Sequence, residues 1–494
     1  MTSSSSTAAY SQLSASSDEE EIMVATSQES LKEFEFSRQN FGGPKRKVSK
    51  NVLGHRTRWY IMVVLLSCLT LNQMNSVAYS FTVICMDDLV EEHHARNLTG
   101  HHWMESSTEK SLIFSATAIG AVMGLVPSVP LIDSLGIRGV LSISGAFSAL
   151  GTLFFPFSVD SNIYAVIFCR VLQGLGVSVI MTVVGVIPGT WAPTSETGTF
   201  MAILSCVFQL SMIICMPVSG FLCESRFGWR SIYYIFGGST IIFYAIFYIF
   251  YTDSPRFHRN VSEKELKKIE DGKMEIVKEG VPYWAICTDG TVLVGWLSVF
   301  GGNFGFTILT LYGPTYLKDV LNFDVKKTGF ATALPFILSA LSKFAAGRIS
   351  DRMDFLTEKM RFSVCTIVSQ GSVVIGLLLM AMTENWRIAQ FAYTFAITAS
   401  GLSIVGNIKC IQLRCRQHTH FALTVSSLGI YANYFGAPIV VGILTSAAGN
   451  TAENWSHLFI IVAVVTVITN APFPFLTSDE PGPYVKVGQK PNEA

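Results

Sequence analysis

The chain alternates long apolar runs with short polar segments from about residue 58 to residue 480. Each run holds about twenty predominantly apolar residues, the length that a helix needs to cross the hydrocarbon core of a bilayer. Charged residues are scarce inside the runs and gather between them, which also indicates membrane-spanning helices. We predict twelve spans, at residues 59–85, 111–132, 139–158, 162–187, 200–223, 231–251, 290–316, 328–349, 362–382, 388–412, 420–446 and 457–477.

The widest polar segment within this region divides the spans six and six. In it, Ser262 followed by Glu265 forms a capping box, which predicts the start of a short helix. The N-terminal stretch has too little apolar content to offset the entropy of ordering, and it lacks the apolar core of a signal peptide. The predicted parts are a disordered cytosolic tail (1–57), a six-helix half (58–251), a cytosolic linker (252–289), a second six-helix half (290–478) and a cytosolic C-terminal tail (479–494).

The composition agrees with an all-α polytopic membrane protein. Half of the residues are apolar and 14% are charged, whereas soluble domains carry about a quarter charged residues. The formal net charge is zero, and no domain gathers the bases, which argues against nucleic acid as a partner. Most of the ten cysteines lie in or beside spans and no pair has zinc-ligand spacing, so we interpret them as small buried hydrophobes rather than a disulfide frame or metal site.

Lysine and arginine gather before the first span, in the linker and after the eighth span. Bases near span ends mark the cytosolic side, so both termini are expected in the cytosol. The sequon Asn97-Leu-Thr99 then falls in the first non-cytosolic loop, and we predict that Asn97 is glycosylated.

The fourth predicted span contains an arginine, Arg170. A charge inside an apolar span is costly, so it faces a protein interior or a watery cavity and is a candidate functional residue. Gln173 lies about one helical turn further on, so both side chains can face one cavity. The alternative is a structural charge bonded to backbone carbonyls.

Other polar residues in the spans are candidate cargo ligands, with an interhelical hydrogen bond as the alternative for each. They are Ser205, Gln209, Asn303, Tyr312, Asn407, Tyr431 and Asn433. Lys343 and Lys409 are candidate replacement charges, although both lie near span ends, where a lysine is also able to snorkel toward water.

Several motifs resemble a known family. Arg170-x-x-Gln173-Gly174, Trp191-Ala-Pro193-x-x-Glu196 and the linker pattern from Ser254 through His258 to Glu265 are similar to those of the organic-anion branch of the major facilitator superfamily, which includes sialin, the vesicular glutamate transporters and the type I sodium-phosphate cotransporters. The resemblance implies two six-helix halves that rock about a central cavity. It also implies a small organic or inorganic anion as cargo, with Arg170 as its main anchor and Gln173 and Gln209 orienting it.

Each half carries an acid and a base in the short loop between its second and third spans. The pairs are Asp133 with Arg138, and Asp351 with Arg352. This arrangement resembles the signature of the superfamily, in which the charges latch helix ends together in one conformational state, so these four residues are expected to act in gating.

The chain also departs from the family pattern. Relatives carry acidic residues on the fourth helix that take up a coupled proton, whereas the corresponding positions here are Gln173 and Val177, which do not titrate. Coupling to protons or sodium therefore stays open. The alternatives are an uncoupled facilitative carrier of the same fold and a non-transporting membrane receptor.

No catalytic constellation is present in the sequence, so we expect no enzyme activity and no cofactor or metal. Four histidines, His93, His94, His101 and His102, lie in the first external loop. They could bind a metal or sense pH, but their spacing fixes no coordination geometry and a solvated loop is favoured. The expected location is the plasma membrane or the membrane of an acidic vesicle or lysosome-like compartment.

Overall fold

A computed structural model of the chain describes residues 55–86, 88–90, 95, 103–193, 196–271, 281–352, 356–404, 406–446 and 451–485. The N-terminal tail, Asn97 and the four loop histidines lie outside the described residues. The side chains of Asp133, Asp351 and Arg352 lie outside them as well, although their backbone is helical.

Twelve helical segments within the described residues are long and apolar enough to cross a membrane, which confirms the twelve predicted spans. In the first half they are formed by α2 (Thr57–Thr82), α4 (Ser107–Ser161), α5 (Ile163–Val177) with α6 (Ile180–Trp191), α7 (Thr197–Leu204) with α8 (Val207–Cys223), and α9 (Arg230–Phe250). In the second half they are formed by α12 (Gly290–Thr315), α13 (Val325–Arg352), α14 (Glu358–Met382), α15 (Trp386–Ser400) with α16 (Asn407–Cys415), α17 (Thr419–Ser446), and α18 (Ala452–Asn470) with α19 (Phe473–Leu476).

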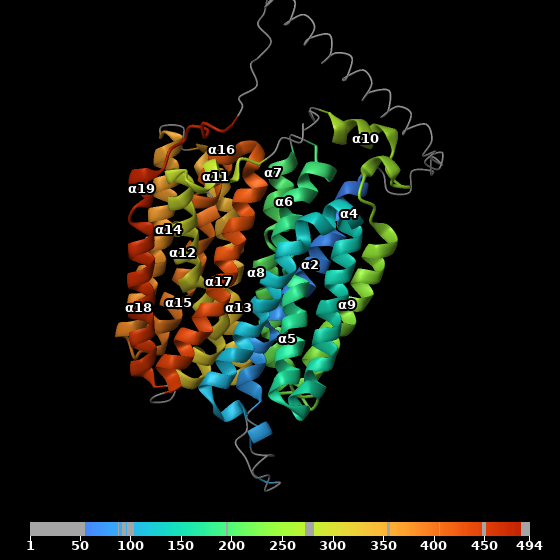
Figure 1. The fold of residues 1–494 in the computed structure, drawn as a ribbon. Helices are drawn as coiled ribbons and strands as arrows, with labels where there is room; N and C mark the ends of the chain where they lie inside the picture. Colours follow the sequence, from blue (N-terminus) through green and yellow to red (C-terminus); the bar gives the residue numbers. More distant parts are fainter. Residues whose placement is uncertain are drawn as a thin grey trace, which may run out of the picture. The chain divides into compact units, whose positions relative to one another are not determined.

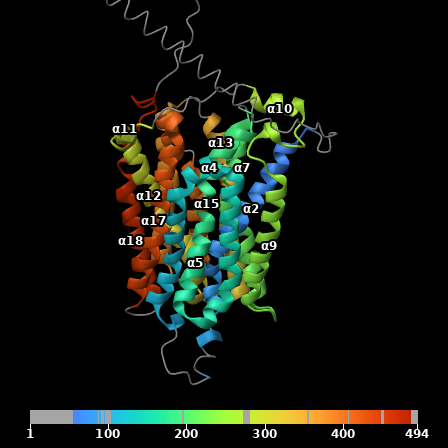
Figure 2. The same cartoon turned by 45° about the vertical axis from the view of Figure 1, so that its right-hand side comes forward.

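The helices form two groups that stand side by side. The first six spans, blue to green in Figure 1, lie on one side, and the last six, yellow to red, lie on the other. The short helices α10 (Glu263–Glu270) and α11 (Tyr283–Cys287) lie at one end of the bundle in both views (Figures 1 and 2). We call this end the linker face, and we call the opposite end, where Cys85 and Cys223 lie, the disulfide face.

The chain turns back at the linker face inside α4, which holds two spans. The turn is at Gly136, whose φ of 70° lies in the left-handed region that favours glycine. A Cβ at Gly136 would lie 2.5 Å from the Oδ2 of Asp253. The backbone N–H of Arg138 donates to Asp253 Oδ1 at 2.9 Å, so the turn is held against the segment that follows α9.

Two spans of the first half are broken near their middle. The fourth span is interrupted between α5 and α6, at residues 178–179, and the fifth between α7 and α8, at residues 205–206. Breaks of this kind are tolerated in membrane helices where neighbouring side chains satisfy the backbone groups. Both breaks face the second half, as their hydrogen bonds described below show.

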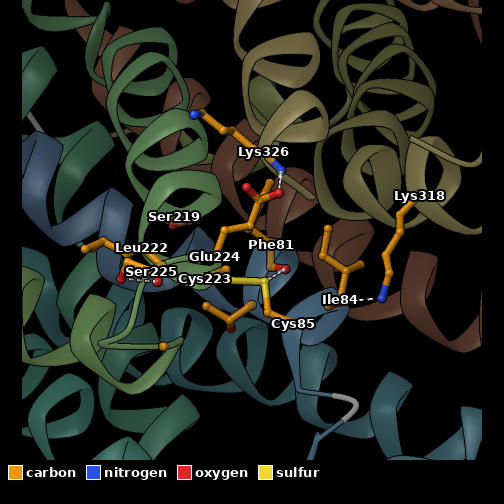
Figure 3. The surroundings of a disulfide bond; sticks show 12 residues. Phe81, Ile84, Cys85, Ser219, Leu222, Cys223, Glu224, Ser225, Lys318 and Lys326 are labelled. Atoms are coloured by element: carbon orange, nitrogen blue, oxygen red, sulfur yellow. Dashed lines mark hydrogen bonds between the residues drawn. A yellow bond between two sulfur atoms is a disulfide. The ribbon is translucent and has the colours of Figure 1, made fainter. Parts of the chain in front are cut away.

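Cys85 and Cys223 form a disulfide, which corrects the interpretation of all the cysteines as isolated buried hydrophobes. The bridge joins the end of the first span to the end of α8, with Cα atoms 6.1 Å apart (Figure 3). The sequence did not reveal the pair because 138 residues separate the two cysteines. The other eight are free, and seven of these are buried as expected.

The residues next to this bridge contact the second half. Glu224 follows Cys223, and its Oε1 accepts the backbone N–H of Lys326 at 2.8 Å (Figure 3). Ile84 precedes Cys85, and its carbonyl accepts the ammonium of Lys318. The disulfide therefore stands where the two halves meet at the disulfide face.

Candidate functional site

A cavity lies between the two halves in the interior of the bundle. It is lined by side chains of the first, second, fourth, fifth and eleventh spans. They include Gln73, Ser76, Thr117, Ala118, Ala121, Val177, Met181, Phe208, Ser427, Ile430, Tyr431 and Tyr434. A site built from both halves, with few polar groups among apolar ones, is typical of a carrier's small-molecule site.

Arg170 lies beside this cavity and is 2% exposed. Its Nη1 donates to the carbonyl of Ser76 at 2.9 Å and to Gln173 Oε1 at 2.6 Å. Its Nε donates to the carbonyl of Ile113 at 3.4 Å, and its guanidinium lies 5.1 Å from the ring centroid of Tyr79. Three spans thus meet at one buried cation.

Close packing of α4 and α5 brings the guanidinium to these partners. The backbone of Gly174 packs directly against α4. A Cβ added at this position would lie 2.1 Å from the carbonyl oxygen of Thr117. Only glycine permits this approach of one backbone to the other. The glycine of the Arg-x-x-Gln-Gly motif therefore sets the distance at which Arg170 meets Ile113.

Among the described residues, no carboxylate forms an ion pair with Arg170, whose hydrogen-bond partners are two backbone carbonyls and a side-chain amide. A buried cation that lacks an acidic partner is costly unless an anion completes its surroundings. Backbone carbonyls therefore hold the guanidinium, and within the described part of the chain its charge is not paired with an acid.

The two glutamines of the candidate site are buried. Gln173 bonds Arg170 on one side, and its Nε2 donates to Thr152 Oγ1 at 3.2 Å on the other. Gln209 is 8% exposed, and its Oε1 has no hydrogen-bond partner among the described residues. Gln173 therefore orients Arg170, whereas the Oε1 of Gln209 is buried without such a partner.

The two candidate tyrosines, Tyr431 and Tyr312, lie in different parts of the bundle. Tyr431 lines the central cavity, and its hydroxyl crosses to the other half to donate to the carbonyl of Val177 at 3.2 Å. Tyr312 lies nearer the disulfide face, where its ring packs 4.8 Å from that of Phe114. This ring pair joins the two halves, and the ring of Tyr79 lies on the other side of the contact, with its centroid 4.7 Å from that of Phe114.

The three candidate asparagines of the second half form hydrogen bonds within their own half. Asn407 donates to Ser298 Oγ at 3.3 Å, and Asn433 donates to the carbonyl of Phe300 at 2.7 Å. Asn303 donates to the carbonyl of Val299 on its own helix at 2.9 Å. The contacts of Asn407 and Asn433 join different spans, as in the alternative given for them, whereas the contact of Asn303 stays within its own helix.

Of the four gating candidates, Arg138 is the one whose side chain is described. Its Nε donates to the carbonyl of Tyr248 at 2.9 Å, and its guanidinium lies 4.3 Å from the ring centroid of Tyr248. These contacts hold the third span to the sixth inside the first half. The gating role of the four residues stays a prediction.

Lys343 does not snorkel, although its place near a span end suggested that it would. It is 8% exposed, and its Nζ donates to the carbonyl of Ser205 on the opposite half at 2.9 Å. Lys409 behaves differently, because its Nζ lies 3.5 Å from Glu358 and a third of its side chain is exposed. The hydropathy pattern did not separate these two lysines.

The linker motif and the Trp-Ala-Pro motif meet at the linker face, which the sequence analysis did not foresee. The Arg58 guanidinium lies 3.1 Å from Glu196, and Lys268 of α10 donates to the same carboxylate at 2.7 Å. Glu265, the last residue of the linker motif, accepts the backbone N–H of Arg58 at 3.0 Å. The signal was present, since these residues belong to the quoted motifs, but their pairing needed the fold.

The electrostatics of this contact follow from its partners. Burial raises the pKa of the Glu196 carboxyl, but the hydrogen bond from Lys268 and the charge of Arg58 outweigh it, and the pKa is lowered from its ordinary value of 4.5. Burial lowers the pKa of His258, whose ring packs edge-on to Trp191 with centroids 5.6 Å apart. Glu196 is thus charged and His258 neutral at neutral pH.

Comparison with known proteins agrees with this architecture. The chain is 25% identical to human sialin over 388 residues, which is 76% of the chain and 77% of sialin. It is 24% identical to sodium-dependent phosphate transport protein 1 of Rattus norvegicus over 85% of the chain and 94% of that protein. It is 24% identical to vesicular glutamate transporter 1 of Bos taurus over 72% of the chain and 64% of that protein.

A solved structure shares the fold. The structure of a D-xylose–proton symporter covers 83% of this chain with a TM-score of 0.64 at 14% identity, and 97% of that chain is covered. A model of the Major Facilitator Superfamily matches residues 64–431. Twelve spans in two groups of six, a cavity lined by both groups and this match over most of the chain place the protein in the major facilitator superfamily of multi-pass membrane transporters.

Proposed function

We propose that the protein carries a small organic or inorganic anion across its membrane by alternating access. The observation that carries the proposal is Arg170, a buried guanidinium without an acidic partner among the described residues. An anionic cargo that reached it from the cavity would supply the missing negative charge through charge-assisted hydrogen bonds. The names of relatives that transport phosphate or glutamate support the same class of cargo.

Ser76 connects the cavity with Arg170. Ser76 lines the cavity and its carbonyl binds the guanidinium, so the two share a boundary. Gln173 fixes the orientation of Arg170, and Gln209 and Tyr431 offer polar groups from the fifth and eleventh spans. In this proposal, rocking of the halves exposes the site alternately at the linker face and the disulfide face.

The linker face is the cytosolic side in this proposal. Basic residues gather there, as the positive-inside rule requires. The Cys85–Cys223 disulfide lies at the opposite face, and disulfides persist in oxidising compartments rather than in the cytosol. The plasma membrane and the membrane of an acidic vesicle or lysosome-like compartment both satisfy this orientation.

Uncoupled transport is a second candidate, and the distribution of acids favours it. The twelve spans contain four acidic residues, and each lies within three residues of a span end: Glu109, Asp319, Glu358 and Glu453. No carboxylate is therefore placed in the middle of a span to take up a coupled proton. In proton or sodium symport, the coupled ion would therefore have to bind to a group outside the spans or to the cargo itself.

The test is uptake into proteoliposomes of labelled inorganic phosphate, glutamate and a sugar acid, with and without inward proton or sodium gradients. The variants are Arg170→Ala, which removes the charge, and Arg170→Lys, which keeps it without the guanidinium geometry. We expect anion uptake by the wild type and a loss of at least about tenfold in Arg170→Ala, as for a hydrogen bond to a charged group. Thermal unfolding in detergent checks that the variants are folded.

Three outcomes separate the candidates. Gradient-driven accumulation that Arg170→Ala abolishes supports a symporter, and flux that ignores every gradient supports a facilitative carrier. Ligand binding without flux in the wild type would support a receptor and overturn the proposal.

A further inference from the structure

Lys343 occupies an unusual position in the interface between the two halves. It belongs to α13 of the second half, and its ammonium reaches the carbonyl of Ser205 in the first half at 2.9 Å. It is 8% exposed, and no described acid forms an ion pair with it. A single neutral carbonyl leaves most of the hydrogen-bonding capacity and all of the charge of an ammonium uncompensated.

Its partner is a broken helix. Ser205 lies at the interruption between α7 and α8, where the helical ladder is irregular. The other broken span of the first half repeats this arrangement, because Val177 at the α5–α6 break accepts the hydroxyl of Tyr431 from the second half at 3.2 Å. Carbonyls at broken helices next to a cavity are groups that transporters use for cargo and ions.

Arg170 and the Lys343–Ser205 contact lie toward opposite ends of the bundle, near the central cavity but outside its lining. Phe208, three residues after Ser205, lines the cavity, and so does Ser76, which binds Arg170. Ser205 is the ninth residue of its span, which puts it roughly 12 Å from the linker face at 1.5 Å per residue. Arg170 is the eighth residue of its span, roughly 10 Å from the disulfide face by the same measure.

We propose that Lys343 is a second cargo-binding cation, which holds the anion on the linker side of the cavity. The inference rests on the proposed function, since it requires an anionic cargo. When cargo moves from Arg170 toward the linker face, its negative charge competes with the Ser205 carbonyl for the ammonium. A charge-assisted bond to an anion is stronger than a bond to a neutral carbonyl, so cargo displaces the contact between the halves.

Gln209 supports the same location. It lies in the first turn of α8, four residues after Ser205 at the break. Its buried Oε1 has no hydrogen-bond partner among the described residues. A polar cargo bound at Lys343, or a water molecule that accompanies it, would supply the missing hydrogen bond to this amide oxygen.

The test measures concentration dependence of uptake for inorganic phosphate and glutamate in Lys343→Met and Lys343→Arg. Met keeps the length of the side chain without its charge, and Arg keeps the charge. Lys409→Met is the matched control, because that lysine lies in another span and is paired with Glu358. We expect the KM of Lys343→Met to rise at least about tenfold, Lys343→Arg to recover much of the affinity, and Lys409→Met to match the wild type.

The outcomes decide the inference separately from the proposed function. If the wild type transports and Lys343→Met keeps its KM, Lys343 does not bind cargo, and the proposed function stands without it. A change in maximal rate alone, with KM unchanged, would make the lysine a latch between the halves and overturn the inference. If the wild type moves no anion, the proposed function itself fails.

A binding measurement provides the control for misfolding of the variant. Lys343→Met is compared with wild type by thermal unfolding with and without inorganic phosphate. Equal melting temperatures without phosphate, together with a smaller phosphate-induced rise in the variant, support the inference. An equal rise in both proteins contradicts it.

Discussion

Arg58 and Glu196 join the start of the first span to the segment between the fourth and fifth, with Arg58 Nη2 and Glu196 Oε2 3.1 Å apart. The Arg58 side chain is 8% exposed and that of Glu196 is 24% exposed, so the pair is partly shielded from solvent. Lys268 of α10 binds the same carboxylate. One glutamate therefore attaches both the first span and the linker helix to the linker face.

Glu196→Gln should loosen the linker helix. The neutral amide removes the counter-charge of Lys268 and one of the two carboxylates that pair with Arg58, the other being Glu265 at 4.0 Å, and we expect a cost of about 1 kcal/mol. Hydrogen exchange of the backbone amides in Glu263–Glu270 should speed up, and this is measured by mass spectrometry. Arg256→Gln is the control, because that exposed residue pairs with Glu270 at the surface and contributes little.

The same contact predicts a pH dependence with a definite sign. The pKa of Glu196 is lowered in the folded protein, so its stabilising contribution is complete above its ordinary value of 4.5 and is lost as the pH falls through the lower folded value. The wild type should thus show faster exchange in the linker helix below pH 4.5 than its intrinsic rates explain. A pH profile of Glu196→Gln identical to that of wild type would contradict this.

Gly136→Ala should destabilise the turn inside α4. Alanine in the left-handed region costs about 1 to 2 kcal/mol, and its Cβ would also meet the Asp253 carboxylate. Thermal unfolding in detergent measures the loss. Gly228→Ala is the matched control, since that glycine also has a positive φ but nothing within 4 Å of an added Cβ. A larger loss at Gly136 than at Gly228 is expected, and equal losses would exclude a role for the Asp253 contact.

The disulfide predicts a thiol count. Alkylation of the denatured, unreduced protein should label eight of the ten cysteines, and reduction should expose the remaining two, Cys85 and Cys223. Peptide mass spectrometry assigns them. Cys85→Ser should give the same count before and after reduction and lower the free energy of unfolding by about 2 to 4 kcal/mol. Ten labelled cysteines without reduction would contradict the bridge.

Gln173→Glu tests whether Arg170 must lack an acidic neighbour in order to bind an anionic cargo. The new carboxylate would lie where Gln173 Oε1 now accepts from Arg170 at 2.6 Å, and it would neutralise the guanidinium. We expect the KM for anions to rise at least about tenfold at neutral pH and to recover partly as acid protonates the carboxyl. Gln173→Met removes the hydrogen bond without adding charge and should show no such recovery. Equal pH profiles of the two variants would count against the charge argument.

The residues of the candidate site differed in how far the sequence could place them. Arg170 and Gln173 were expected to share a face of one helix, and their side chains do meet, because a spacing of three residues brings side chains onto one face. Lys343 and Lys409 looked alike, because hydropathy reports the distance to a span end and not the neighbour that meets the side chain. One proved to cross between the halves and the other to pair at the edge.

The sequence by itself determined the number of spans, their division six and six, and the family motifs. These are local properties, because a helix needs about twenty apolar residues in a row to cross a bilayer and forms its backbone hydrogen bonds within that segment. The tertiary structure alone decided which residues meet: Cys85 with Cys223, Arg58 with Glu196, and Lys343 with the Ser205 carbonyl. The partners in each pair come from different spans and loops, and only the packing of the helices sets the distance between their side chains.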